Sequence, residues 1–119
     1  METKIHEFDP VIYPRLLWIV VNPQDSNLKE YFEDYDFTFK QQKAICCGVT
    51  KRNPRESGFL IVFKSKKYLD ADTIAHEASH VAMDLFNELG IEFDGTHQEA
   101  LSYFIGWVAK CCEQVKKLK

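Results

Sequence analysis

The chain has 119 residues, of which 45% are hydrophobic and 28% are charged, and its formal net charge is −3 at pH 7. A chain of this length is expected to form one domain, residues 1–119, with its own core. The net negative charge argues against nucleic acid as a partner. The first ten residues lack the apolar run of a secretory signal, and the longest apolar run, 16–21, is too short to span a bilayer. These features predict a cytoplasmic protein that does not bind membranes.

The first half of the chain contains short apolar segments that predict strands. Residues 13–21 predict a strand that ends at Asn22-Pro23. Residues 44–51 and 58–64 predict two more strands, and the turn-forming residues between them favour a β-hairpin. Because 58–64 directly precedes the first long helix, we expect it to be the edge strand of the sheet beside that helix.

Helices are predicted in three places. Residues 27–34 favour a short helix, with Asn27 and Glu30 as its candidate capping pair. Two long helices follow, one over 71–89 that ends at Gly90 and one from 96 or 97 to about 115. We therefore predict an α+β fold, in which a small antiparallel or mixed sheet of about three strands packs on two long helices, with the short helix early in the chain.

The first long helix has two distinct faces. At about 100° per residue, one arc is apolar and includes Ala75, Ala78 and Leu85. The opposite arc is polar, and its members are His76, Glu77, His80, Asp84 and Asn87. The polar arc is therefore the candidate functional face of this helix.

The polar face contains the motif H-E-x-x-H, from His76 to His80. Residues four apart stand one above the other on a helix, so both imidazoles can bind one ion. Zinc lowers the pKa of a bound water, and a neighbouring carboxylate such as that of Glu77 can take its proton. The motif predicts a Zn²⁺ site with His76 and His80 as ligands and Glu77 as general base. A polar helix face with two histidines and no metal would show the same pattern.

Glu99, near the start of the last predicted helix, is a candidate third ligand. With this spacing the sequence resembles the gluzincins, zinc peptidases whose third ligand is a glutamate on the following helix. More narrowly, it is similar to the minigluzincins and other short bacterial or phage-borne single-domain relatives. The resemblance covers about residues 58–112 and implies zinc ligands His76, His80 and Glu99, general base Glu77 and a peptide or protein substrate. It also implies that an extended peptide would pair with the strand at 58–64.

Other interpretations of the same residues remain open at this stage. Thr96 and Glu99 also fit a capping box that needs no metal. Tyr103, one turn after Glu99, is a candidate catalytic residue that would donate a hydrogen bond to an oxyanion, or a half-buried tyrosine. Asp84 is a candidate partner for a ligand imidazole or a solvated carboxylate. SprT-like metalloproteases take a third histidine, and His97 is available for that role, although the helical wheel places it toward the apolar arc.

Alternatives to an enzyme are a latent peptidase fold that serves as a binding or regulatory module, and a helical interaction domain without metal. The cysteines form two adjacent pairs, Cys46-Cys47 and Cys111-Cys112, without zinc-ribbon spacing. We expect them to be buried thiols, with a four-thiolate site as the less favoured alternative. Trp18 and Trp107 are expected in the core.

Overall fold

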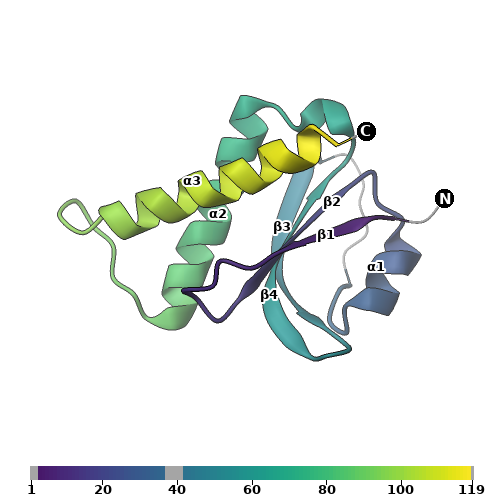
Figure 1. Ribbon diagram of the computed structural model, residues 1–119, viewed down its shortest axis with the longest axis horizontal. Helices are drawn as coiled ribbons and strands as arrows, with labels where there is room; N and C mark the ends of the chain where they lie inside the picture. Colours follow the sequence, from purple (N-terminus) through teal and green to yellow (C-terminus); the bar gives the residue numbers. More distant parts are fainter. Residues whose placement is uncertain (1–2, 37–41, 119) are drawn as a thin grey trace.

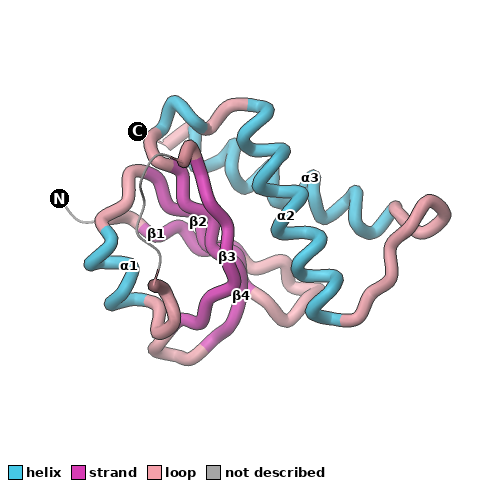
Figure 2. The backbone as a smooth tube through the Cα atoms, turned by 180° about the vertical axis from the view of Figure 1, so that it is seen from behind, coloured by secondary structure: helices cyan, strands magenta, loops and turns pink. Residues whose placement is uncertain are grey.

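The computed structural model describes residues 3–36 and 42–118 and shows an α+β fold with a mixed sheet between two groups of helices (Figure 1). The two long helices cover one face of the sheet, and the short helix lies on the other (Figure 2). The elements are β1 (Ile5–Phe8), β2 (Leu16–Val21), α1 (Asp25–Tyr31), β3 (Ala44–Lys51), β4 (Glu56–Phe63), a 3-10 helix (Lys66–Tyr68), α2 (Ala71–Leu89) and α3 (Glu99–Lys116). No helix in the described ranges is long and apolar enough to cross a membrane.

The sheet has four strands in the order β1-β2-β4-β3, where three were expected. β2 pairs in parallel with β4, whereas β1–β2 and β3–β4 are antiparallel. The predicted hairpin of β3 and β4 is confirmed. The prediction that 58–64 forms the edge strand is wrong, because β4 lies between β2 and β3 and its backbone is paired on both sides. The strand at the sheet edge on this side is β3.

The run from Phe59 to Phe63 explains why β4 is central. All five of these residues are buried, although consecutive side chains point to opposite faces of the sheet. A strand that is apolar on both faces is typical of the covered interior of a sheet. Gly58 begins this run beside Leu16 of β2, where a Cβ atom would collide with the Leu16 backbone. The close approach of the two strands therefore depends on a glycine at this position.

Consecutive side chains of the sheet point to opposite faces and belong to two separate hydrophobic cores. Leu17 and Ile19 face α2 and α3, whereas Trp18 and Val20 face α1. All four are buried, as the sequence predicted for Trp18. The indole N–H of Trp18 donates to Glu7 of β1 at 2.9 Å. Strand β1 is short and polar at His6 and Glu7, which is why its sequence did not predict a strand.

The ends of α2 follow local sequence rules. Its observed range is identical to the predicted one, 71–89. At its start, the Asp70 side chain accepts a hydrogen bond from the Thr73 backbone N–H at 3.0 Å. At its end, Gly90 has φ of 69°, a left-handed conformation that glycine adopts without strain.

The predicted capping pair of α1 is wrong, and the capping-box alternative for α3 does not occur. The N-cap of α1 is Gln24, and the Asn27 side chain instead accepts a hydrogen bond from the Thr3 backbone N–H. The N-cap of α3 is Gln98, so Thr96 and Glu99 do not form a capping box. Thr96 and the residue after it lie in a turn held by the Asp94 carboxylate, which shortens the predicted helix by two to three residues.

Helices α2 and α3 pack against each other and run in roughly antiparallel directions. Phe104, near the start of α3, packs against Phe86 near the end of α2, with ring centroids 6.5 Å apart. Tyr13 makes an edge contact with both rings. Further along α3, Cys112 lies close enough to Glu77 for the charge of that carboxylate to raise the pKa of its thiol. The start of α3 therefore lies beside the end of α2, away from the histidine motif.

Candidate metal centre

His76 and His80 face each other on the exposed side of α2. Their Nε2 atoms are 3.2 Å apart, and their ring centroids are 4.7 Å apart with an interplanar angle of 78°. Both residues are exposed, and the His76 side chain has 67% of its surface accessible. The i, i+4 spacing thus brings the two imidazole nitrogens together as the motif predicted.

The separation of the two nitrogens fits a shared zinc ion. Zinc binds imidazole nitrogen at about 2.0–2.1 Å in a tetrahedral arrangement, which puts two such nitrogens about 3.3–3.4 Å apart. The observed 3.2 Å is close to this value. The same distance also suits a hydrogen bond in which one ring N–H donates to the other ring nitrogen.

Glu77 is buried, unlike the two histidines. It retains 6% of its accessible surface, and one carboxylate oxygen lies 3.9 Å from Nε2 of His76. The helical wheel placed Glu77 on the polar arc and Ala75 on the apolar one, and both placements are wrong, because Ala75 is exposed. Burial of a carboxylate costs free energy, so a buried glutamate beside two exposed histidines is a feature that core packing alone does not explain.

The thiol of Cys46 provides a partner for the Glu77 carboxylate. Cys46 lies on β3 and packs against the core on the α2 side of the sheet. Burial raises the pKa of this thiol to about 12, with further contributions from the charges of Glu77 and Asp84 and from a hydrogen bond to Glu77. The thiol therefore stays protonated at neutral pH and can donate to the carboxylate. The Glu77 carboxylate therefore lies beside the edge strand.

The structure does not bring Glu99 to the histidine pair. No group of three or more His, Cys, Asp or Glu side chains within residues 3–36 and 42–118 is arranged to hold a metal ion. Glu99 is exposed in the first turn of α3, and the direction of α3 places that turn beside the opposite end of α2. Its role as a third ligand remains a prediction from the family resemblance.

His97 and Tyr103 lie with Glu99 at the start of α3. His97 precedes the helix and is exposed, so its expected place toward the apolar arc is wrong. Its Nδ1 lies 3.0 Å from the Asp94 carboxylate. Tyr103 is 76% exposed rather than half-buried. The structure therefore gathers these three residues at one end of the helix pair, and His76, Glu77 and His80 nearer the other.

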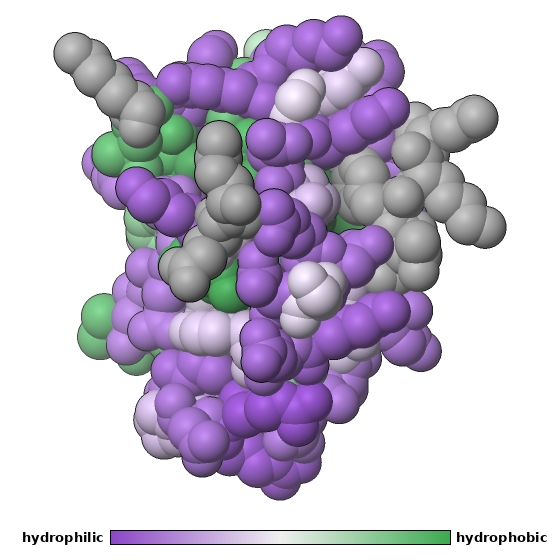
Figure 3. Space-filling model, turned by 90° about the vertical axis from the view of Figure 1, so that its right-hand side faces the viewer, coloured by the Kyte–Doolittle hydropathy of each residue, from purple (hydrophilic) through white to green (hydrophobic). Residues whose placement is uncertain are grey.

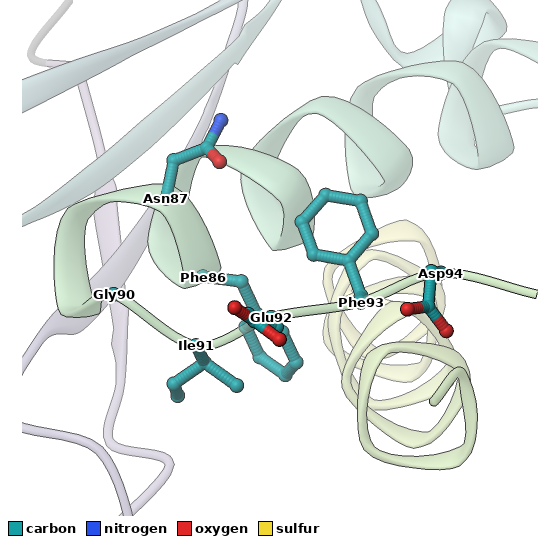
Figure 4. Close-up of a pocket in the computed structure, with 7 residues that line it drawn as sticks. All are labelled: Phe86, Asn87, Gly90, Ile91, Glu92, Phe93 and Asp94. Carbon is teal, nitrogen blue, oxygen red and sulfur yellow. The ribbon is translucent and has the colours of Figure 1, made fainter. Parts of the chain in front are cut away.

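One surface hollow lies beside the histidine motif, and another lies where α2 ends. One, of about 410 Å³, adjoins the motif and is lined by Lys43, Ala44, Asp72, Thr73, His76 and Glu77. The other, of about 560 Å³, lies where α2 ends and is lined by residues from Phe86 to Asp94 (Figure 4). Figure 4 shows the aromatic rings of Phe86 and Phe93 there, with the carboxylates of Glu92 and Asp94. The second hollow contains no residue of the motif, so the smaller one is the candidate substrate site.

The remaining cysteines are consistent with the expected buried thiols. Cys111 and Cys112 are buried, and burial raises their pKa values to about 11 and about 12. Cys47 is half-buried on the α1 side of the sheet, opposite Cys46. The two cysteines of β3 thus face opposite cores, and no four-thiolate cluster occurs among the described residues.

The chain was also compared with known proteins. No family model, no curated protein and no solved structure matches it. The functional conclusion therefore rests on the geometry of the motif and on the sequence resemblance.

Proposed function

We propose that the protein is a zinc-dependent hydrolase of the metallopeptidase type, in which His76 and His80 bind the metal and Glu77 is the general base. The observation that supports this best is the 3.2 Å separation of the two imidazole nitrogens next to a buried carboxylate. His76 and His80 supply two of the imidazole ligands that zinc prefers, and Glu99 stays the proposed third ligand from the family resemblance. A zinc ion bound there would act as a Lewis acid and lower the pKa of a bound water.

The chain's own residues have separate roles in this proposal. His76 and His80 bind the ion from the exposed side of α2. Glu77, held beside His76 and against Cys46, takes a proton from the attacking water and returns it to the leaving amine. The hollow beside Ala44 and Thr73 receives the substrate chain next to the carboxylate.

The strand nearest the motif is β3 rather than β4. β3 forms the sheet edge, and its first residue lines the same hollow as His76 and Glu77. An extended peptide that binds by strand addition would therefore align with the Ala44 end of β3. At the other end of β3, Lys51 is bridged to Phe32, so that part of the edge is already paired.

Zinc content and peptide cleavage test the proposal together. The purified protein should bind about one zinc ion per chain, measured by elemental analysis. Glu77→Gln should keep the zinc but lose cleavage of a fluorogenic peptide library, because an amide cannot accept the proton. Glu92→Gln, which makes the same change at an exposed site, should cleave as fast as the wild type.

Each other outcome has a definite meaning. A protein that takes up no zinc, even after zinc is added, contradicts the metal site. If the protein binds zinc but cleaves no peptide, the proposed peptidase activity is contradicted, and a latent fold that acts as a binding module is favoured. Equal cleavage by the wild type and the Glu77→Gln variant contradicts the role of Glu77.

A further inference from the structure

The charges along the α2–α3 pair are unevenly distributed, although the net charge of the chain is only −3. Acidic side chains collect where α2 ends and α3 begins, and all of the following are exposed: Glu88, Glu92, Asp94 and Glu99. Exposed lysines collect at the opposite end of the helix pair. We call this second group the lysine end, and it consists of Lys43, Lys64, Lys66, Lys67, Lys116 and Lys117.

Two hydrogen bonds show that these lysines belong to one surface, although they come from three parts of the chain. The Lys64 backbone N–H donates to the Lys43 carbonyl at 2.9 Å, which joins the start of β3 to the end of β4. The Lys66 ammonium donates to the Leu118 carbonyl at 2.7 Å, which brings the 3-10 helix against the end of α3. Figure 3 views the molecule from the side of the chain termini, and hydrophilic residues cover most of this face.

The lysine end reaches the candidate substrate site through Lys43. This side chain lines the 410 Å³ hollow together with His76 and Glu77. Three carboxylates lie in the same region, those of Asp70 and Asp72 at the start of α2 and that of Glu113 near the end of α3. Asp70 accepts the Thr73 N–H, and Asp72 lies in the first helical turn, where the helix dipole stabilises negative charge. The lysines outnumber these carboxylates, so the surface next to the hollow attracts negative charge.

We infer that the protein selects polypeptide segments rich in aspartate and glutamate, which the lysine end holds while the adjoining backbone enters the hollow beside His76 and Glu77. The inference rests on the proposed function for the place of the backbone. The lysine end contains no arginine, the residue that forms bidentate contacts with phosphate. The hollow is also bordered by an edge strand, which pairs with peptide backbone. Both features favour an acidic peptide over a nucleic acid.

Binding can be measured without turnover in the full-length Glu77→Gln protein. The probes are fluorescent 12-residue peptides, one glutamate-rich and one with glutamine in place of each glutamate, followed by fluorescence anisotropy at low and high salt. The glutamate peptide should bind roughly tenfold more tightly at low salt, and the advantage should shrink as salt screens the charges. Equal binding of the two peptides overturns the inference.

Matched variants locate the surface. The double substitution Lys64→Gln with Lys67→Gln should weaken binding of the acidic peptide by roughly three- to tenfold, and Lys43→Gln should also weaken it. The control double, Lys29→Gln with Lys110→Gln, removes the same charge from α1 and the middle of α3 and should change binding by less than about twofold. Equal losses in the two doubles overturn the inference.

Two further outcomes separate the inference from its alternatives. Tighter binding of a 12-nucleotide single strand than of the acidic peptide overturns it in favour of nucleic acid. Selective binding of the acidic peptide by a protein that takes up no zinc and cleaves nothing supports the lysine end while contradicting the proposed function.

Discussion

The two ends of the α2–α3 pair differ in how their residues are brought together. Around the motif, His76 and His80 meet because they are four residues apart on one helix. Around the start of α3, the position of Glu99 depends on how a second helix packs, and the Phe86–Phe104 contact sets that position. Local geometry thus builds the histidine pair, whereas tertiary packing keeps the expected third ligand away from it. The comparison separates contacts that a sequence motif determines from those that it only suggests.

The largest effect is expected at the motif itself. Loss of a partner that only supports a metal ligand costs about 10–100-fold in affinity, so loss of a ligand should cost more. We expect His80→Ala to lower zinc affinity by more than about a hundredfold, measured by competition with a chromogenic chelator. His97→Ala is the matched control and should retain zinc. An equal loss in the two variants would indicate a three-histidine site.

A second variant weakens the other end of the helix pair. Phe86 is buried and contacts Tyr13, Phe93 and Phe104. We expect Phe86→Ala to lower the free energy of unfolding by about 3–5 kcal/mol, measured by urea denaturation. The exposed neighbour Asn87, changed to alanine, should cost less than about 0.5 kcal/mol.

Zinc titration of the same variant sharpens the comparison. If local geometry builds the pair, the folded fraction of Phe86→Ala should bind zinc with nearly wild-type affinity. A large loss of affinity in protein that remains folded would show that the histidine pair depends on the packing of α3.

The arrangement of the helices in this structure predicts the smallest effect at Glu99. Glu99 is exposed and lies at the far end of the helix pair here, so if α3 keeps this position when zinc binds, Glu99→Ala should change zinc affinity by no more than about twofold, like other surface substitutions. Glu92→Ala provides a control with the same change of charge. A loss as large as that of His80→Ala would instead show that α3 reaches the metal in the zinc-bound protein, as the gluzincin resemblance implies.

The sequence predicted the length and the C-terminal end of α2 from neighbouring residues. The helical period gives the length, and Gly90 marks the end by its capping position. The Asp70 cap at the start of α2 was not predicted, although an aspartate directly before the helix was the available signal. The burial of Glu77 was not predicted, because the helical wheel groups it with polar residues and its direction depends on tertiary neighbours, Cys46 of β3 and Cys112 of α3. The position of β4 depends on pairing with β2, which is distant in sequence. The apolar run from Phe59 to Phe63 was the available signal that this strand is covered on both faces.

The parallel pairing of β2 with β4 also bears on how the protein folds. Leu16 pairs with Gly58, and the intervening chain contains α1 and β3. Closing such a long loop is entropically costly and slows folding, whereas a helix forms quickly from local contacts. During synthesis, β1 and β2 emerge before β4, so β2 stays unpaired on one side until β4 is available. We therefore expect the histidine pair to form with α2 itself, whereas Glu77 becomes buried when α2 packs against β3 and α3.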